Sequence, residues 1–429
     1  MQKAYLIQNT WDIFCKIVDN YGDIGICWRL ARQLRLEHGL KIRLWIDDFE
    51  TAKKIITELD ISINQQICND ITIIKWDDHT DFNSAANVVI EAFTCELPPA
   101  YLVAMVQKQS TWINLEYLSA EPWIDEFHAK TLPHGNLHAN AKLIRHFYFP
   151  GFTAKTGGLI RERHIVTQLQ DALIFFPQVS GHATEREIGI KRVALDIAQL
   201  ANLPSNNFSS VKLSPANLST INGRDAFINE GVKISLFCYP NAPIKDLLTY
   251  LQANDHAVFL YVPQSSILPK IAEFFGKKTI RVGDKIIKNK LIVEILPFLS
   301  QADYDQLLRD CDLNFVRGED SWIRAIWAGK PFIWQPYWQT EHTHIIKLNA
   351  FINLYYANYQ QKQMVCESHR YWATGQGSQV GFNNFLSQNL INLKFIQTYT
   401  LMQAKILAQQ DDLVTKLVDF CNKVSINSQ

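Results

Sequence analysis

Two aspartates four residues apart follow a short apolar run near the start of the chain. The run at residues 11–18 (WDIFCKIV) leads into Asp19, Asn20, Tyr21, Gly22 and Asp23, and a helical pattern begins directly after it. Ligands of parallel sheets bind beyond the carboxyl ends of the strands, so one of these carboxylates could be a general base. The alternative is local, because Asp23 could cap the helix while Gly22 makes the turn.

A second loop, Arg317-Gly318-Glu319-Asp320-Ser321, lies between a predicted strand and a predicted helix. A helix N-terminus offers free N–H groups and positive dipole to an anion, and a glycine permits close backbone approach. Arg317 could clamp a diphosphate, and Glu319 and Asp320 could accept hydrogen bonds from hydroxyl groups. The alternative is a well-capped helix with a solvated arginine.

Two further loops combine aromatic side chains with an amide. Phe237 and Tyr239 end the run KISLFCY, and Phe298 and Gln301 lie in LPFLSQ. Aromatic faces beside a glutamine suit a planar base, which would stack and accept amide hydrogen bonds. Aromatic packing in the protein core is the alternative.

The composition narrows the function class. The chain has 429 residues, 42 Lys and Arg, 42 Asp and Glu, and a formal net charge of +0. A balanced charge argues against a nucleic-acid binder, because such domains usually carry a basic excess. No apolar run approaches the ~18 residues of a membrane span, and the start lacks the pattern of a signal peptide. We therefore expect a cytoplasmic protein without membrane or nucleic-acid partners.

Motifs for metals and common cofactors are missing from the sequence. The eight cysteines contain no C-x-x-C pair, and His342 and His344 lack zinc-ligand spacing. We expect reduced core thiols, ordinary polar histidines and no metal site. Neither G-x-G-x-x-G nor a P-loop motif occurs, which argues against an ordinary dinucleotide or P-loop site.

Apolar runs and helical patterns alternate along most of the chain. The predicted strands are 11–18, 40–47, 71–76, 87–93, 111–115, 233–239, 257–262, 291–296, 313–316 and 331–334. The predicted helices are 24–38, 49–59, 244–252, 268–275, 302–309, 321–327 and 411–424. Such alternation indicates two α/β domains with parallel sheets that face a central cleft.

The segment at 200–223 is rich in Ser, Asn and Pro, which is typical of a loop or connection. We predict a first α/β domain at 1–180, a second α/β domain at 181–385 and a helical segment at 386–429; the family resemblance described below implies that the first lies on the acceptor side and the second binds a nucleotide sugar. Packing of that last segment back onto the first domain is one option.

Five long blocks together resemble one known family: WDIFCKIVDNYGDIGICWRLARQL, VVIEAFTCELP, WINLEYLSAEPW, FYFPGFTAKTGGL and FVRGEDSWIRAIWAGKPFIW. They are similar to blocks of the EarP family, bacterial protein-arginine rhamnosyltransferases that modify elongation factor P. The resemblance runs from about residue 10 to about residue 350, and the blocks keep the family's order. The segment at about 160–228 departs from the family pattern.

The resemblance implies a GT-B fold of two Rossmann-like domains, with dTDP-β-L-rhamnose as donor and an arginine of elongation factor P as acceptor. It implies inversion at the anomeric carbon without a metal or cofactor. In the family both aspartates of the D-N-Y-G-D motif are essential, which here are Asp19 and Asp23, with Asp23 as the general base. The family's donor-binding elements fall on Phe237, Tyr239, Phe298, Gln301, Arg317, Glu319, Asp320, Ser321 and Tyr337.

Two other functions remain open on the residues alone. One is a GT-B glycosyltransferase with another donor or acceptor, because the fold does not define the substrate. The other is a non-catalytic nucleotide-binding module, which would bind the nucleotide without transferring a sugar.

Overall fold

The computed structural model describes residues 10–19, 21–77, 79–134, 143–171, 231–391 and 393–427. These residues form two compact units. The first unit contains Met1–Arg163, Gly318–Ile323 and Gln410–Gln429, and the second contains His164–Arg317 and Arg324–Gln409. The predicted segment 200–223, the predicted boundary after residue 180 and Asn20 of the aspartate motif all lie outside the described residues.

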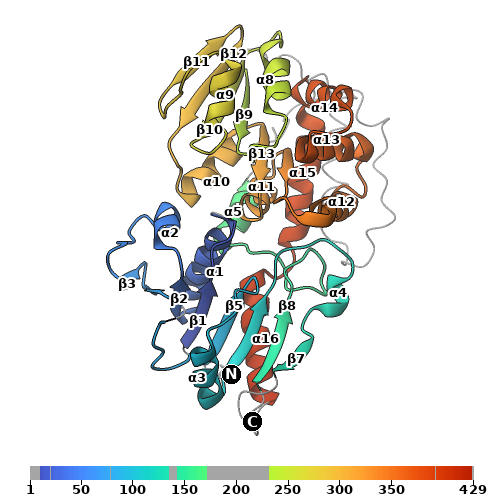
Figure 1. The fold of residues 1–429 in the computed structure, drawn as a ribbon. Coiled ribbons are helices and arrows are strands. Elements are labelled where there is room, and N and C mark those ends of the chain that lie inside the picture. The colour runs from blue at the N-terminus through green and yellow to red at the C-terminus, as the bar shows by residue number, and fades with distance from the viewer. Residues whose placement is uncertain are drawn as a thin grey trace. The chain divides into compact units, whose positions relative to one another are not determined.

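The first unit is built on an eight-stranded sheet with the order β3-β4-β2-β1-β5-β6-β8-β7 (Figure 1). Its strands are β1 (Thr10–Cys15), β2 (Lys41–Ile46), β3 (Gln65–Cys68), β4 (Ile71–Lys75), β5 (Val88–Ala92), β6 (Thr111–Leu115), β7 (Thr131–His134) and β8 (Leu143–Tyr148). All neighbours pair in parallel except the two edge pairs, β3 with β4 and β7 with β8. The chain reverses its direction of strand addition between β1 and β5, so this sheet has its switch point there.

The sequence of β1 explains its central place. Five of its six residues are buried, as expected for a strand covered on both faces. Asp12 is the polar exception, and the guanidinium of its register partner Arg43 donates to both of its carboxylate oxygens at 2.6 Å. Phe14 joins a buried aromatic cluster with Trp45, stacked at 5.3 Å, and Tyr101 at 4.6 Å. Strand β1 is therefore a rigid base for the loop that follows it.

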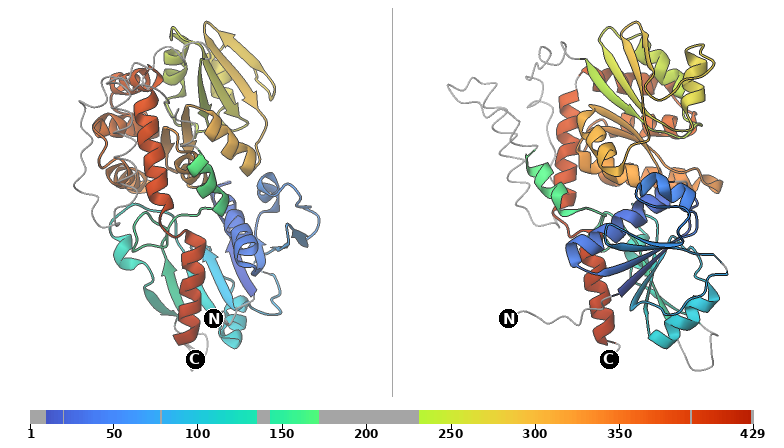
Figure 2. Two further views of the ribbon diagram at one scale, coloured as in Figure 1. Left: turned by 180° about the vertical axis from the view of Figure 1, so that it is seen from behind. Right: turned by 90° about the vertical axis from the view of Figure 1, so that its left-hand side faces the viewer.

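Helices of the first unit are α1 (Gly22–His38), α2 (Phe49–Ile55), α3 (Pro99–Lys108), α4 (Ile124–Phe127) and α16 (Leu413–Asn427). Helix α1 ends at Gly39, whose left-handed backbone (φ 69°) lets its N–H reach two carbonyls of the last turn. Helix α16 comes from the end of the chain and packs against α1 and β6 (Figure 2). The ring of Phe420 lies 5.6 Å from that of Tyr148, so the last helix completes the core of the first sheet.

The second unit has a six-stranded sheet with the order β11-β12-β10-β9-β13-β14. Its strands are β9 (Val232–Leu236), β10 (Val258–Pro263), β11 (Lys285–Lys288), β12 (Leu291–Leu296), β13 (Leu313–Arg317) and β14 (Phe332–Gln335). Only the edge pair β11 with β12 is antiparallel. The switch point of this sheet lies between β9 and β13.

Helices of the second unit are α5 (Arg163–Asp171), α8 (Ile244–Gln252), α9 (Leu268–Phe274), α10 (Gln301–Asp310), α12 (Thr343–Tyr355), α13 (Lys362–Thr374), α14 (Gln379–Ile391) and α15 (Leu393–Ala408), with a 3₁₀ turn η2 (Thr340–His342). Helix α11 (Asp320–Ala328) begins in residues counted with the first unit and ends in the second. The core of the second unit is aromatic, with Phe315 4.5 Å from Trp372 and Phe332 6.0 Å from Phe351.

The expected alternation of strands and helices is confirmed, and so is the α/β class with two parallel-rich sheets. Several boundaries differ from the prediction. Strand β1 stops at Cys15, strand β9 stops at Leu236, and helix α2 stops at Ile55 because Ile56 leaves the helical region (φ −103°, ψ 85°). The elements that were not predicted are the edge strands β3, β7 and β11, strand β8, and helices α3, α4, α5 and α12 to α15.

Candidate active site

The loop after β1 is organised around the carboxylate of Asp23. Asp23 lies in the first turn of α1, one residue past its start, and Tyr21 is the N-cap. Its Oδ2 accepts the backbone N–H groups of Val18 at 2.8 Å and Asp19 at 2.9 Å. The side chain is 2 % exposed. Asp23 therefore does not cap the helix, and instead ties the preceding loop to it.

Asp19 lies closer to the solvent than Asp23. It is half-buried, and its carbonyl accepts the N–H of Gly22 at 2.7 Å, which closes the turn. A Cβ on Gly22 would come within 3.0 Å of Oδ2 of Asp19. The glycine in the motif thus leaves room for the Asp19 side chain, and both predicted carboxylates lie at the switch point of the first sheet.

Tyr117 provides a third donor to Asp23, from the loop after β6. Its hydroxyl donates to Oδ1 of Asp23 at 3.3 Å, and its ring stacks on Phe93 at 4.4 Å with 12° between the planes. Burial, and then the nearby charge of Asp23, raise the pKa of Tyr117, so the phenol stays protonated. Sequence reasoning assigned no role to Tyr117 or Phe93, although both lie in the quoted blocks VVIEAFTCELP and WINLEYLSAEPW.

A buried carboxylate supports the loop that carries Phe93. Glu91 on β5 accepts the N–H of Glu96 at 3.0 Å and the indole N–H of Trp112 at 3.0 Å, and pairs with Arg145 at 2.7 Å. Burial raises the pKa of Glu91, and the Arg145 guanidinium opposes that rise. These bonds hold the loop against its unfavourable backbone, because Phe93, Thr94 and Glu96 all have positive φ (57°, 54° and 59°).

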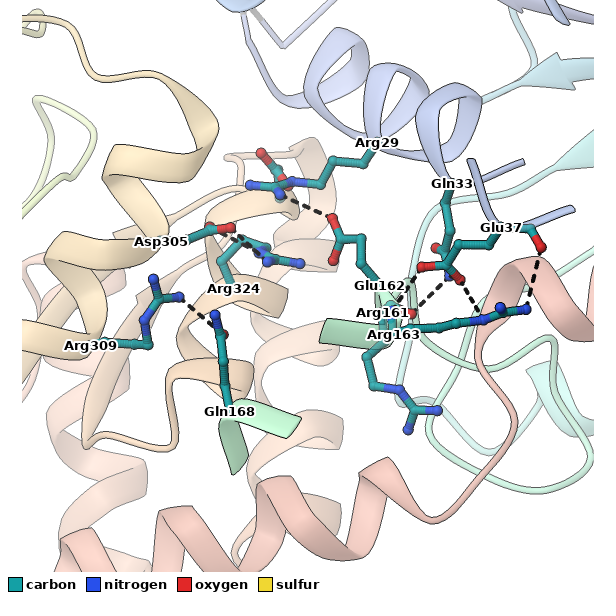
Figure 3. A network of polar contacts seen from close by, with 11 residues as sticks. Arg29, Gln33, Glu37, Arg161, Glu162, Arg163, Gln168, Asp305, Arg309 and Arg324 are labelled. Carbon is teal, nitrogen blue, oxygen red and sulfur yellow. Dashed lines mark hydrogen bonds and ion pairs between the residues drawn. The ribbon is translucent and has the colours of Figure 1, made fainter. Parts of the chain in front are cut away.

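Glu319 and Asp320 of the Arg317–Ser321 loop are counted with the first unit, and both bond to other residues of that unit. Oε2 of Glu319 accepts the N–H of Leu118 at 3.0 Å. Oδ1 of Asp320 accepts Nε–H of Arg29 at 2.8 Å, and the same guanidinium pairs with Glu162 at 3.2 Å (Figure 3). In this structure the two carboxylates thus have protein partners. Their predicted contacts with the donor stay a prediction.

The second unit brings four predicted residues together at its own switch point. The guanidinium of Arg317, at the end of β13, lies 4.4 Å from the ring centre of Phe237 and 4.7 Å from that of Tyr239. Tyr239 in turn lies 5.9 Å from Tyr337. Cation–π contacts with two aromatic rings hold an arginine in position, and its guanidinium supplies positive charge at this edge of the sheet.

Gln335, at the end of β14, was missed by the sequence analysis. Its Oε1 accepts the N–H of Tyr239 at 2.8 Å, and its Nε2 donates to Asn241 at 3.0 Å. The carbonyl of Cys238 accepts Nη1–H of Arg317 at 3.4 Å. The available sequence signal was a glutamine directly after the predicted apolar strand 331–334. It fixes the loop after β9 and hence the two rings beside Arg317.

The predicted base-binding residues lie at the loop between β12 and α10. Phe298 is half-buried in that loop, and Gln301 begins α10 after the N-cap Ser300. Tyr304, one turn further along α10, packs edge-on against Phe237 at 5.6 Å. Ser321 is buried in the first turn of α11, counted with the first unit. The predicted residues therefore form two groups, one in each unit.

Among the described residues, no group of three or more His, Cys, Asp or Glu side chains is suited to a metal ion. The rings of His342 and His344 lie 6.4 Å apart, and Nδ1 of His344 contacts the carbonyl of Gln339. All eight cysteines are free thiols. Within the described ranges, no helix is long and apolar enough to cross a membrane.

Curated relatives and solved structures agree on one activity. A protein-arginine rhamnosyltransferase of Pseudomonas aeruginosa is 40 % identical over 350 residues, covering 81 % of this chain and 82 % of the relative. One of Shewanella oneidensis is 34 % identical over 427 residues, covering 96 % and 98 %. A structure described as the structural basis for EarP-mediated arginine glycosylation of translation elongation factor EF-P matches with a TM-score of 0.57 and 28 % identity, covering 96 % of this chain and 98 % of that one.

Two parallel-rich α/β units with clustered polar groups at their switch points, together with these relatives, define a glycosyltransferase of the GT-B class. The model of the family described as Elongation-Factor P (EF-P) rhamnosyltransferase EarP matches residues 11–422. The chain belongs to this family and is a protein-arginine rhamnosyltransferase.

Proposed function

We propose that this enzyme transfers L-rhamnose from dTDP-β-L-rhamnose to an arginine of elongation factor P, with inversion at the anomeric carbon. The observation that carries the proposal is the oriented, buried carboxylate of Asp23 at the switch point of the first sheet. The family membership and the arginine glycosylation of EF-P named for the matching structure support the choice of acceptor.

The acceptor chemistry explains why a fixed carboxylate is needed. An arginine guanidinium has a pKa above about 12 and delocalised nitrogen lone pairs, so it is a poor nucleophile. Asp23 orients one N–H₂ group and takes its proton as the nitrogen bonds to the anomeric carbon. It need not deprotonate arginine beforehand. Asp19 is the second carboxylate available to hold the cation.

The leaving group requires positive charge in the second unit. As the C–N bond forms, the bond between the anomeric carbon and the diphosphate oxygen breaks, and dTDP departs with that electron pair. Arg317, held between Phe237 and Tyr239, neutralises the growing negative charge, which is a role that a metal ion fills in other enzymes. Tyr337 beside Tyr239, and Phe298 and Gln301 at the start of α10, are proposed to contact the donor's phosphates and base.

One assay tests the proposal against its rivals. Purified elongation factor P is incubated with the enzyme and dTDP-rhamnose and then weighed by mass spectrometry. We expect a gain of one deoxyhexose with wild-type enzyme, and none with Asp23→Asn, which still binds dTDP. Binding of dTDP without a mass gain would favour a non-catalytic module, and a gain only with another donor or acceptor would favour a different glycosyltransferase.

A further inference from the structure

The carboxylate of Asp23 has different partners on its two oxygens. Oδ2 accepts two backbone N–H groups at 2.8 and 2.9 Å, so its lone pairs are engaged by the loop itself. Oδ1 accepts a longer bond, 3.3 Å, from the hydroxyl of Tyr117. A carboxylate oxygen has two acceptor positions, so Oδ1 retains capacity for a proton while Tyr117 occupies one side. Oδ1 is therefore the oxygen that can act as the base.

The ring of Tyr117 is itself held in place. Phe93 stacks on it at 4.4 Å and nearly parallel, and the N–H of Phe93 donates to the carbonyl of Leu115 at 2.7 Å. Phe93 has φ 57°, a left-handed conformation that is strained for a non-glycine residue. Such strain persists where the surroundings enforce it, and Glu91 supplies that support through the N–H of Glu96.

We infer that Tyr117, stacked on Phe93, is a positioning residue that fixes Oδ1 of Asp23 for the proton transfer. This inference rests on the proposed function of Asp23. The phenol orients the carboxylate, because its hydroxyl donates to Oδ1 at 3.3 Å and so occupies one of the two acceptor positions of that oxygen.

The inference predicts a specific kinetic pattern for Tyr117→Phe. A lost hydrogen bond to a charged group lowers kcat about tenfold to a hundredfold. The KM for dTDP-rhamnose stays at the wild-type value, because the donor does not depend on this hydroxyl. A role in stability alone would lower the amount of folded enzyme and leave the kcat of the folded fraction unchanged.

Two further variants keep the test decisive. Phe93→Leu removes the stacked ring but leaves the hydroxyl, and we expect a smaller fall in kcat with an unchanged KM for dTDP-rhamnose. Tyr371→Phe is the matched control, since the hydroxyl of Tyr371 donates to Asp246 at 2.6 Å in the second unit. That control should leave kcat and KM unchanged.

The possible failures are distinguishable. If wild-type enzyme adds no deoxyhexose to elongation factor P, the proposed function is overturned and this inference falls with it. If wild-type enzyme is active and Tyr117→Phe retains the wild-type kcat, only the role of Tyr117 is overturned. A Tyr117→Phe defect in KM alone would also contradict it, because a positioning residue acts on the chemical step.

Discussion

Gly25 lies next to the carboxylate of Asp320, and a Cβ at position 25 would come within 2.9 Å of Oδ2 of Asp320. The carboxylate cannot simply swing away, because Oδ1 of Asp320 accepts Nε–H of Arg29 at 2.8 Å from the next turn of the same helix. The glycine of the G-D-I-G run therefore makes room for a residue almost three hundred positions away in the sequence.

We expect Gly25→Ala to lower the melting temperature and the transfer rate. Crowding of this kind typically costs about 1–3 kcal/mol, more than the ~1 kcal/mol that alanine gains over glycine inside a helix. In an Asp320→Ala background the same change should be neutral or stabilising, because the clash is gone. Thermal unfolding of the four variants measures this coupling, and additive effects would contradict the contact.

Arg317 should determine the affinity for the nucleotide. Replacing it by alanine removes a fixed cation from between Phe237 and Tyr239, and we expect dTDP to bind about tenfold to a hundredfold more weakly. Arg317→Lys keeps the charge but loses the planar stacking, so it should recover only part of the affinity. Calorimetric titration with dTDP measures both, with Asp23→Asn as a control that binds normally. Unchanged affinity in Arg317→Ala would exclude a phosphate clamp.

His369 should make the second unit sensitive to acid. It is fully buried near Phe332 and Tyr356, its Nδ1–H donates to the carbonyl of Val365 at 2.9 Å, and burial lowers its pKa to about 4. An unfolded histidine has a pKa of about 6.5, so between pH 6.5 and about 4 the unfolded state binds a proton that the folded state does not. The free energy of unfolding should therefore fall by about 3 kcal/mol as the pH falls through this range.

The check compares unfolding of wild type and His369→Gln across this range. The variant should be less stable at pH 7 and should lose less stability on acidification. His256→Gln, at an exposed position, is the control and should follow the wild-type curve. Parallel curves for wild type and His369→Gln would show that the buried ring does not take up the proton.

The ion pair of Arg324 and Asp305 should be a strong stability determinant. The two side chains are 1 % and 9 % exposed, and their hydrogen bonds are 2.6 Å and 2.9 Å long. Figure 3 shows the pair. Arg324→Met removes the cation that faces this buried carboxylate, which typically costs about 3–5 kcal/mol. The double change Arg324→Met with Asp305→Leu should recover most of that loss. Chemical denaturation measures it, and the exposed pair Lys285–Glu294 offers a control, since Lys285→Met should cost less than about 1 kcal/mol.

Local patterns predicted most of both sheets and the loops at their switch points. The apolar runs that became β1, β5, β9 and β13 were recognisable because parallel strands are buried on both faces. Edge strand β3 was missed because two of its four residues are exposed. Helices α12 to α15 were missed because apolar residues such as Ile352 and Phe382 face several neighbours, which obscures a helical period.

The contacts around the carboxylates could not be derived from spacing. Tyr117 and Phe93 follow two different strands, and only the pairing of β5 with β6 places those loops side by side. The bond from Arg29 to Asp320 spans 291 positions. The left-handed backbone of Phe93 has no sequence signal either, because it depends on support from buried Glu91.

The make-up of the first unit has a consequence for biosynthesis. Gln33 on α1 donates to the carbonyl of Arg161 at 2.8 Å (Figure 3) and to Asp412 at 3.0 Å. Helix α16, which begins directly after Asp412, packs against β6. Domains commonly fold in the order in which they leave the ribosome. Here strand β1 and helix α1, which hold Asp23, precede the second unit in the sequence, whereas Asp412 and helix α16 follow it. The first unit can therefore be completed only after the second unit has been translated.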